Sequence, residues 1–106
     1  MIKKLLSILL LSIPLIIFSQ EKNVSNLSTA PNPFTNSTEI TFNAPLNASI
    51  ILKVRNILGK TVFKKTYTVK SGKNNITFYK KDIATGMYIY SIQNKNKIIS
   101  KRFIIQ

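Results

Sequence analysis

Apolar and polar residues alternate with a period of two from Glu39 to the end of the sequence. Such alternation is typical of β-strands that bury one face, and the apolar positions are mostly β-branched or aromatic, as strands favour. No stretch of this region shows the period of an amphipathic helix. Short polar breaks divide the pattern and predict six strands, at residues 39–43, 49–56, 61–69, 75–79, 87–93 and 98–106.

The alternation also predicts which side chains point inward. The strands at 49–56 and 87–93 each place three apolar residues on one face, which are Ile50, Leu52, Val54, Tyr88, Tyr90 and Ile92. The strand at 61–69 has apolar residues on both faces, so its inward face stays unassigned. For every tyrosine, packing in or beside the core is one interpretation, and an exposed platform that stacks nucleic acid or sugar is the other.

Each glycine of the chain lies at a predicted turn. Gly59, Gly72 and Gly86 follow or precede strands, and a positive φ at these positions would let the chain reverse direction. Gly86 would then fix the register of the strand that carries Tyr88, since a slip of one residue turns every side chain to the other face. We expect Gly86→Val to cost about 1 to 3 kcal/mol of stability, because a bulky residue would be forced into a special backbone conformation.

Strands separated by turns and never by helices predict an all-β fold. A compact antiparallel β-sandwich of the immunoglobulin-like kind is the form expected, and a partly open barrel is the alternative. A parallel sheet would need crossover helices and continuous apolar runs, and the sequence has neither in this region.

The N-terminal segment has the layout of a helical secretory signal peptide over residues 1–19. Lys3 and Lys4 precede an apolar run from Leu5 to Phe18, which is shorter than the roughly 20 residues that a membrane-spanning helix needs. A retained anchor is the alternative, but we expect no stable transmembrane anchor. Cleavage is predicted between Ser19 and Gln20. Residues 20–30 are expected to be a polar linker, and residues 31–106 the folded domain, entered through the stiff "PNPF" segment.

Composition excludes most catalytic and metal-binding chemistry. The chain has no cysteine and no histidine, and its acids are Glu21, Glu39 and Asp82. A catalytic triad would lack its base, a zinc site its usual ligands, and a glycosidase would need two carboxylates brought together by chance. The sequence therefore predicts no enzyme and no cofactor.

The formal net charge of +13 has two explanations. One is a compositional bias towards Lys, Asn and Ile, and the other is attraction to an anionic surface or an acidic partner. Nucleic acid would be the first partner considered for a cytoplasmic chain of this charge, for example through an oligonucleotide-binding barrel, but the export signal argues against it.

A series of short motifs appears in a fixed order: "PNPF", "ITF", "ILKVRNILGKTV", "SGKNNITF" and "DIATGMYIYSI", followed by a basic closing strand. In this order and spacing, behind a signal peptide, residues 30–106 resemble the type A C-terminal sorting domain of the type IX secretion system of Bacteroidota. The resemblance implies a β-sandwich that takes a cargo from the periplasm across the outer membrane. A cell-surface sortase then removes the domain and can attach the cargo to anionic lipopolysaccharide.

The resemblance also implies a function, partners and a set of sorting residues. The chain is expected to be a non-enzymatic sorting signal, exported to the periplasm and then secreted or held at the cell surface, with the translocon and the sortase as partners. The sorting motif would comprise Pro31, Asn32, Pro33, Gly59, Lys60, Gly86, Tyr88, Lys101 and Arg102. Asn56 stands where family members often have an acidic residue, which should leave the turn chemistry unchanged.

Two further alternatives concern how the domain is used. The last strand would lie at a sheet edge, where Lys101 and Arg102 either dock a partner or protect the edge from aggregation. The domain as a whole could instead be a free-standing exported adhesive or surface-binding module that is never cleaved.

Overall fold

The computed structural model of the chain describes residues 23–45, 48–95 and 97–106. The predicted signal peptide and its cleavage site at Ser19 and Gln20 lie outside the described residues. None of the residues described forms a helix long and apolar enough to cross a membrane.

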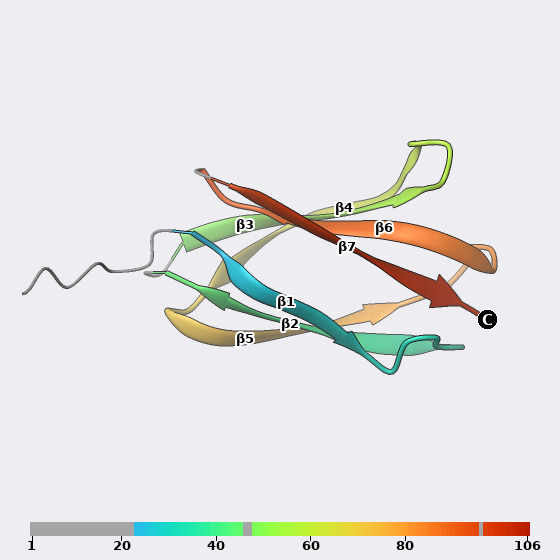
Figure 1. Cartoon of the computed structure of the whole chain (residues 1–106), viewed down its shortest axis with the longest axis horizontal. Coiled ribbons are helices and arrows are strands. Elements are labelled where there is room, and N and C mark those ends of the chain that lie inside the picture. The colour runs from blue at the N-terminus through green and yellow to red at the C-terminus, as the bar shows by residue number, and fades with distance from the viewer. Residues whose placement is uncertain (1–22, 46–47, 96) are drawn as a thin grey trace, which may run out of the picture.

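Seven antiparallel strands form two sheets that pack face to face (Figure 1). The strands are β1 (Ser25–Ala30), β2 (Ser37–Ala44), β3 (Ala48–Asn56), β4 (Thr61–Val69), β5 (Gly72–Tyr79), β6 (Gly86–Gln93) and β7 (Ile98–Ile105). One sheet has the order β1-β2-β5 and the other β4-β3-β6-β7. The successive strands β1–β2, β3–β4 and β6–β7 are paired, whereas the connections β2–β3, β4–β5 and β5–β6 cross between the sheets. The domain is therefore a small all-β sandwich of the expected immunoglobulin-like kind.

All six predicted strands are present, but the structure adds a seventh where a linker was expected. Strand β1 lies within residues 20–30 and pairs with β2, with an irregular register between Ser25 and Ser28. Val24 and Leu27 are buried in the core, and the hydroxyls of Ser28 and Thr41 hydrogen-bond across the pair at 2.7 Å. With Leu27 as its one large apolar residue, β1 has too little alternation to be recognised as a strand, and pairing with β2 stabilises it.

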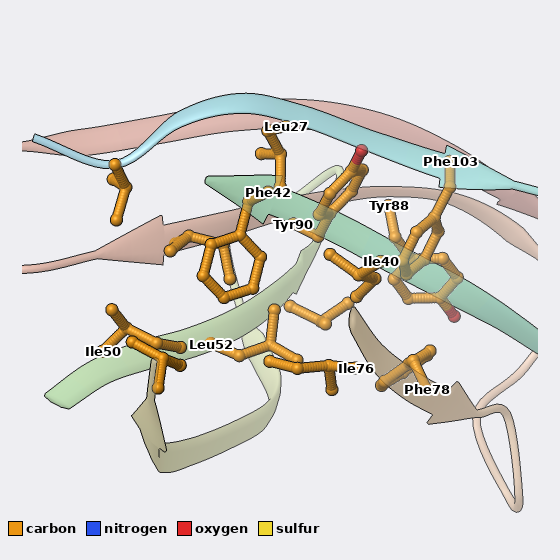
Figure 2. Packing of buried hydrophobic residues seen from close by; sticks show 14 of the residues in the cluster. Leu27, Ile40, Phe42, Ile50, Leu52, Ile76, Phe78, Tyr88, Tyr90 and Phe103 are labelled. Atoms are coloured by element: carbon orange, nitrogen blue, oxygen red, sulfur yellow. The ribbon is translucent and has the colours of Figure 1, made fainter. Parts of the chain in front are cut away.

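The core lies between the two sheets and is rich in aromatic rings (Figure 2). The predicted inward residues of β3 and β6 are all buried, as are Ile40 and Phe42 of β2. The rings of Tyr90 and Phe103 stack with centroids 5.0 Å apart, and Phe103 also stacks on Phe78 at 5.4 Å. Stacked and edge-to-face rings add about 0.5 to 1.5 kcal/mol per pair beyond the area that they bury. The packing interpretation of Tyr88 and Tyr90 is therefore confirmed.

Two features of the strands differ from the simplest pattern. A bulge in β4 opposite Val54 and Arg55 lets both Val62 and Phe63 pack against the core, which explains the apolar residues on both faces of that segment. Tyr79, in contrast, is 58% exposed, so the interpretation that every tyrosine packs in or beside the core is wrong for this residue. It follows the inward Phe78 in β5 and so points away from the core.

Candidate recognition site at one end of the sandwich

Three connections and the C-terminus meet at the same end of the sandwich. Strands β1, β3, β5 and β7 run towards this end, and β2, β4 and β6 run away from it (Figure 1). We call it the motif end and define it as residues 31–36, 56–60 and 80–86 together with Gln106. Ladder pairs hold these segments together, because Asn56 lies opposite Tyr88 and Gly86 opposite Ile105. The motif end therefore gathers residues that are more than 70 positions apart in the chain.

The Pro31–Asn32–Pro33 segment of the motif end is attached to the free edge of β7. The side-chain amide of Asn32 donates to the carbonyl of Arg102 at 3.2 Å, and its oxygen accepts from the backbone N–H of Ile104 at 3.0 Å. Thr38 donates its hydroxyl hydrogen to the carbonyl of Pro31 at 2.6 Å. Asn32 thus offers β7 one donor and one acceptor, as a neighbouring strand would.

Phe34 continues this attachment and carries it into the core. Its backbone forms an isolated parallel bridge with Ile105, through hydrogen bonds to the carbonyl of Ile104 and from the N–H of Gln106. Its ring is buried and meets Phe103 and Phe78 edge-to-face, with centroid distances of 5.1 and 6.3 Å. The "PNPF" segment therefore joins the two sheets, which goes beyond the stiff entry that the prolines alone predict.

Hydrogen bonds to one asparagine side chain fix the turn at 56–60. The Asn56 side-chain oxygen accepts from the N–H groups of Leu58 and Lys60, both at 3.0 Å, and its backbone carbonyl accepts from Gly59 at 3.0 Å. Gly59 has φ +86°, as expected. A carboxylate could accept the same two bonds, so the geometry accounts for an acid or an amide at this position.

Gly86 and Tyr88 together fix the connection that leads into β6. Gly86 has φ +149°, a conformation that side chains disfavour, and a Cβ atom there would meet nothing closer than the Tyr88 ring at 3.9 Å. The cost expected for Gly86→Val thus comes from the backbone and not from a clash. The Tyr88 hydroxyl donates to the carbonyl of Ala84 at 2.6 Å while its ring stays in the core.

Lys101 and Arg102, adjacent in the predicted motif, are not brought together. Successive residues of a strand point to opposite faces, and Lys101 shares its side with the buried Phe103 and Ile105. Arg102 therefore points to the outer face of the four-stranded sheet. Both side chains are exposed, but they cannot form one basic patch.

Strand β7 is an edge strand, as expected, and the outer edge of its C-terminal half is hydrogen-bonded to the segment around Asn32 and Phe34. The backbone groups of Ile104 that point away from β6 bond to Asn32 and Phe34. Those of Ser100 point the same way, since alternate residues of an antiparallel strand share an orientation. The attached segment ends at Asn32, opposite Arg102. Before that residue, β1 lies near β7 but forms no hydrogen-bonded ladder with it.

The turn at 56–60 carries an exposed apolar tip that was not predicted from the sequence. Ile57 and Leu58 are 72% and 88% exposed, more than any other large hydrophobic side chain that the structure describes. Their position between Asn56 and Gly59 would predict this exposure, because the two middle residues of a tight turn lie too far from the core to pack in it.

A groove of about 560 Å³ opens on the side of the sandwich where β4 and β5 face each other without pairing. Phe63, Phe78 and Ile83 contribute apolar surface to it, and Lys65 and Lys81 line it with charge. The open side explains why Phe63 is only partly buried, although its ring meets Phe78 at 5.2 Å.

The charge of the described domain is almost entirely positive. Glu39 and Asp82 are its acids, and residues 23–45, 48–95 and 97–106 contain no group of three potential metal ligands. Burial raises the pKa of the Tyr90 phenol, against a weaker opposite effect of its hydrogen bond to Thr29, and burial also raises the pKa of Tyr67. Both phenols therefore stay neutral at physiological pH, and the lysines and arginines dominate the charge.

The fold and the hydrogen-bonded motif end define a small immunoglobulin-like β-sandwich. The profile of the secretion system C-terminal sorting domain matches residues 28–106, and the chain belongs to this family. The resemblance to sorting domains of type IX secretion is thus confirmed, and the match begins inside β1 and includes every segment of the motif end. The family is one of sorting signals and not of enzymes. A comparison with curated proteins finds no match.

Proposed function

We propose that this domain directs secretion across the outer membrane of a Bacteroidota cell by the type IX system, after a signal peptide has taken the chain to the periplasm. The translocon binds the folded domain, and a cell-surface sortase then removes it and attaches the segment that precedes it to anionic lipopolysaccharide. The chain performs no catalysis. Family membership supports the role of a C-terminal sorting signal, and the more specific steps are our proposal.

One observation supports the motif end as the recognised surface. Segments that contribute Pro31, Asn32, Gly59, Lys60 and Gly86 meet there, and hydrogen bonds to backbone or side chain hold each segment. A surface built mainly from fixed backbone has the same outline in every folded copy. Such an outline suits recognition by shape, which a signal without reactive groups requires.

The experiment places a reporter protein ahead of Asn23 in a bacterium that has the type IX system and in a strain without its translocon. We expect the reporter at the cell surface or in the medium of the first strain and in the periplasm of the second. The mass of the released reporter shows whether the domain has been removed. If the reporter stays in the periplasm of both strains while the domain is folded, the proposal is rejected.

Two lysines in turns at opposite ends of the sandwich provide a matched pair of variants. Lys60 lies at the motif end, and Lys70 lies between β4 and β5 at the other end, and both side chains are exposed. Their turn hydrogen bonds use backbone groups, which alanine keeps. We expect Lys60→Ala to reduce reporter secretion and Lys70→Ala to leave it unchanged. Equal effects would argue against recognition at the motif end.

A free-standing surface-binding module is the second candidate. The exposed Ile57 and Leu58 on a basic domain favour it, because exposed apolar residues often mark a binding surface. Recovery of the intact domain on secreted protein, without removal, would favour this candidate over a cleaved signal.

A further inference from the structure

The outer face of the four-stranded sheet, which points away from the core, carries cations and no acid among the described residues. Because Leu52, Val54, Tyr90 and Phe103 point inward, their neighbours in the strands point outward. The outward cations are Lys53, Arg55, Lys64 and Arg102. Glu39 belongs to β2 in the other sheet, and Asp82 lies in the connection between β5 and β6.

The cations of the outer face lie close to one another. Lys53 is directly opposite Lys64 in the β3–β4 pair, and Arg55 and Arg102 lie on either side of Ile89 in neighbouring strands. Like charges directly opposite each other in a sheet are destabilising. Binding an anionic surface would remove this repulsion, so the arrangement favours a negatively charged partner.

The same face also exposes aliphatic side chains. Met87, Ile89 and Ile104 are about 40% exposed there, and Met87 and Ile104 are paired across β6 and β7. The turn between β3 and β4 extends beyond the sheet on the side away from β1, β2 and β5 (Figure 1), and Ile57 and Leu58 are the exposed residues of this turn. Because the Asn56 side chain holds this turn, the tip keeps its position relative to the cations.

We propose that the outer face docks on an anionic lipid surface. Its lysines and arginines contact phosphate-bearing headgroups, and Ile57 and Leu58 enter the boundary between headgroups and acyl chains. Cations around a short apolar projection are the combination that interfacial membrane binding uses. A protein partner would need a pocket for the tip, whereas a lipid surface needs none. The proposal rests on the charge and exposure of this face and not on the sorting role.

Fluorescence of an introduced tryptophan tests the proposal in the full chain, which has no tryptophan of its own. Leu58→Trp places the probe at the tip, and Tyr79→Trp places it on the exposed side of the other sheet. The probes are vesicles of phosphatidylcholine alone and vesicles mixed with phosphatidylglycerol. We expect the emission of Leu58→Trp to shift to the blue on the mixed vesicles only, and that of Tyr79→Trp to stay unchanged. Each tryptophan reports only whether its own position contacts lipid. Binding of vesicles through residues 1–22 would therefore not by itself shift the emission of Leu58→Trp.

Two adjacent residues on opposite faces of β7 give a matched charge test. Arg102→Glu and Lys101→Glu change the net charge equally, but only Arg102 lies on the outer face. In the Leu58→Trp background, we expect Arg102→Glu to raise the lipid concentration for a half-maximal shift by at least about fivefold. Lys101→Glu should raise it by less than half as much.

Three outcomes would overturn the proposal. The first is an emission of Leu58→Trp that does not shift on the mixed vesicles, or that shifts equally on vesicles of phosphatidylcholine alone. The second is an equal rise in the lipid concentration for a half-maximal shift in Arg102→Glu and Lys101→Glu, which would mean unspecific attraction by total charge. The third is a shift of the same size on adding polyglutamate without lipid, which would point to an acidic protein partner.

Discussion

At the residue scale, the side chain of Asn32 hydrogen-bonds to the edge of β7 as the backbone of a neighbouring strand would. Its amide presents a donor and an acceptor to Arg102 and Ile104 in β7, where Pro31 and Pro33 on either side have no N–H to offer. An alanine would keep the backbone but lose both bonds. The identity of this residue therefore matters more than its exposed position suggests.

We expect Asn32→Ala to lower the free energy of unfolding in urea by about 1 to 2 kcal/mol, the usual contribution of two hydrogen bonds. Asn36→Ala is the control, because Asn36 is also exposed in the same connection and its backbone carbonyl, not its side chain, accepts from Lys80. A loss of the same size in both variants would mean that the bonds of Asn32 to β7 contribute nothing.

Tyr88 allows one hydrogen bond to be removed without disturbing the core. Tyr88→Phe keeps the buried ring and deletes the hydroxyl that donates to Ala84, so the free energy of unfolding should fall by about 1 kcal/mol. Tyr79→Phe deletes a hydroxyl from an exposed ring and should change stability by less than about 0.5 kcal/mol. If thermal and urea unfolding of the two variants coincide, Tyr88 does not hold the connection at 80–85.

At the element scale, β7 is an edge strand with two different halves. Asn32 and Phe34 hydrogen-bond to the half that begins at Arg102, and no hydrogen-bonded ladder joins the half before it to the nearby β1. Hydrogen exchange followed by NMR should therefore show the amide of Ile104 exchanging at least about tenfold more slowly than that of Ser100. Asn32→Ala should speed exchange at Ile104 and not at Phe103, which points to β6. Equal protection at Ile104 and Ser100 in the unchanged protein would contradict this division of the strand.

The sequence predicts those elements that alternate and bury one face. Strands β2, β3 and β5 to β7 do so, and the inward residues of β3 and β6 follow from the period alone. Strand β1 escapes prediction because its stability comes from pairing with β2 and from Leu27, not from its own pattern. The bulge in β4 hides that strand's inward face for a related reason, since one extra residue shifts the alternation.

The motif end is only partly predictable from the sequence. Positive φ at Gly59 and Gly86 follows from the chemistry of glycine in turns. The attachment of Asn32 to β7 does not follow, because it joins residues 70 positions apart and depends on how the sheets pack. The opposite orientation of Lys101 and Arg102 follows from strand alternation, because successive residues of a strand point to opposite faces.

At the scale of the whole molecule, the first strand links the two sheets and completes the core. Val24 and Leu27 are buried, and the Tyr90 hydroxyl reaches Thr29 of β1 at 3.4 Å from the opposite sheet. The chain then passes through "PNPF" along β7 before it enters β2. The folded unit therefore extends before Pro31, where the sequence placed its boundary.

Shortening the chain tests this larger unit. A chain that begins at Pro31 loses two buried side chains at about 1.5 to 3 kcal/mol each, a large part of the roughly 5 to 15 kcal/mol that stabilises a typical domain. We expect a chain from Asn23 to keep the circular dichroism and urea midpoint of the full chain, and a chain from Pro31 to unfold at much lower urea. Leu27→Ser in the full chain should show part of the same loss, which ties the effect to packing and not to the new terminus. Two shortened chains of equal stability would mean that β1 is dispensable, and that the domain begins at Pro31.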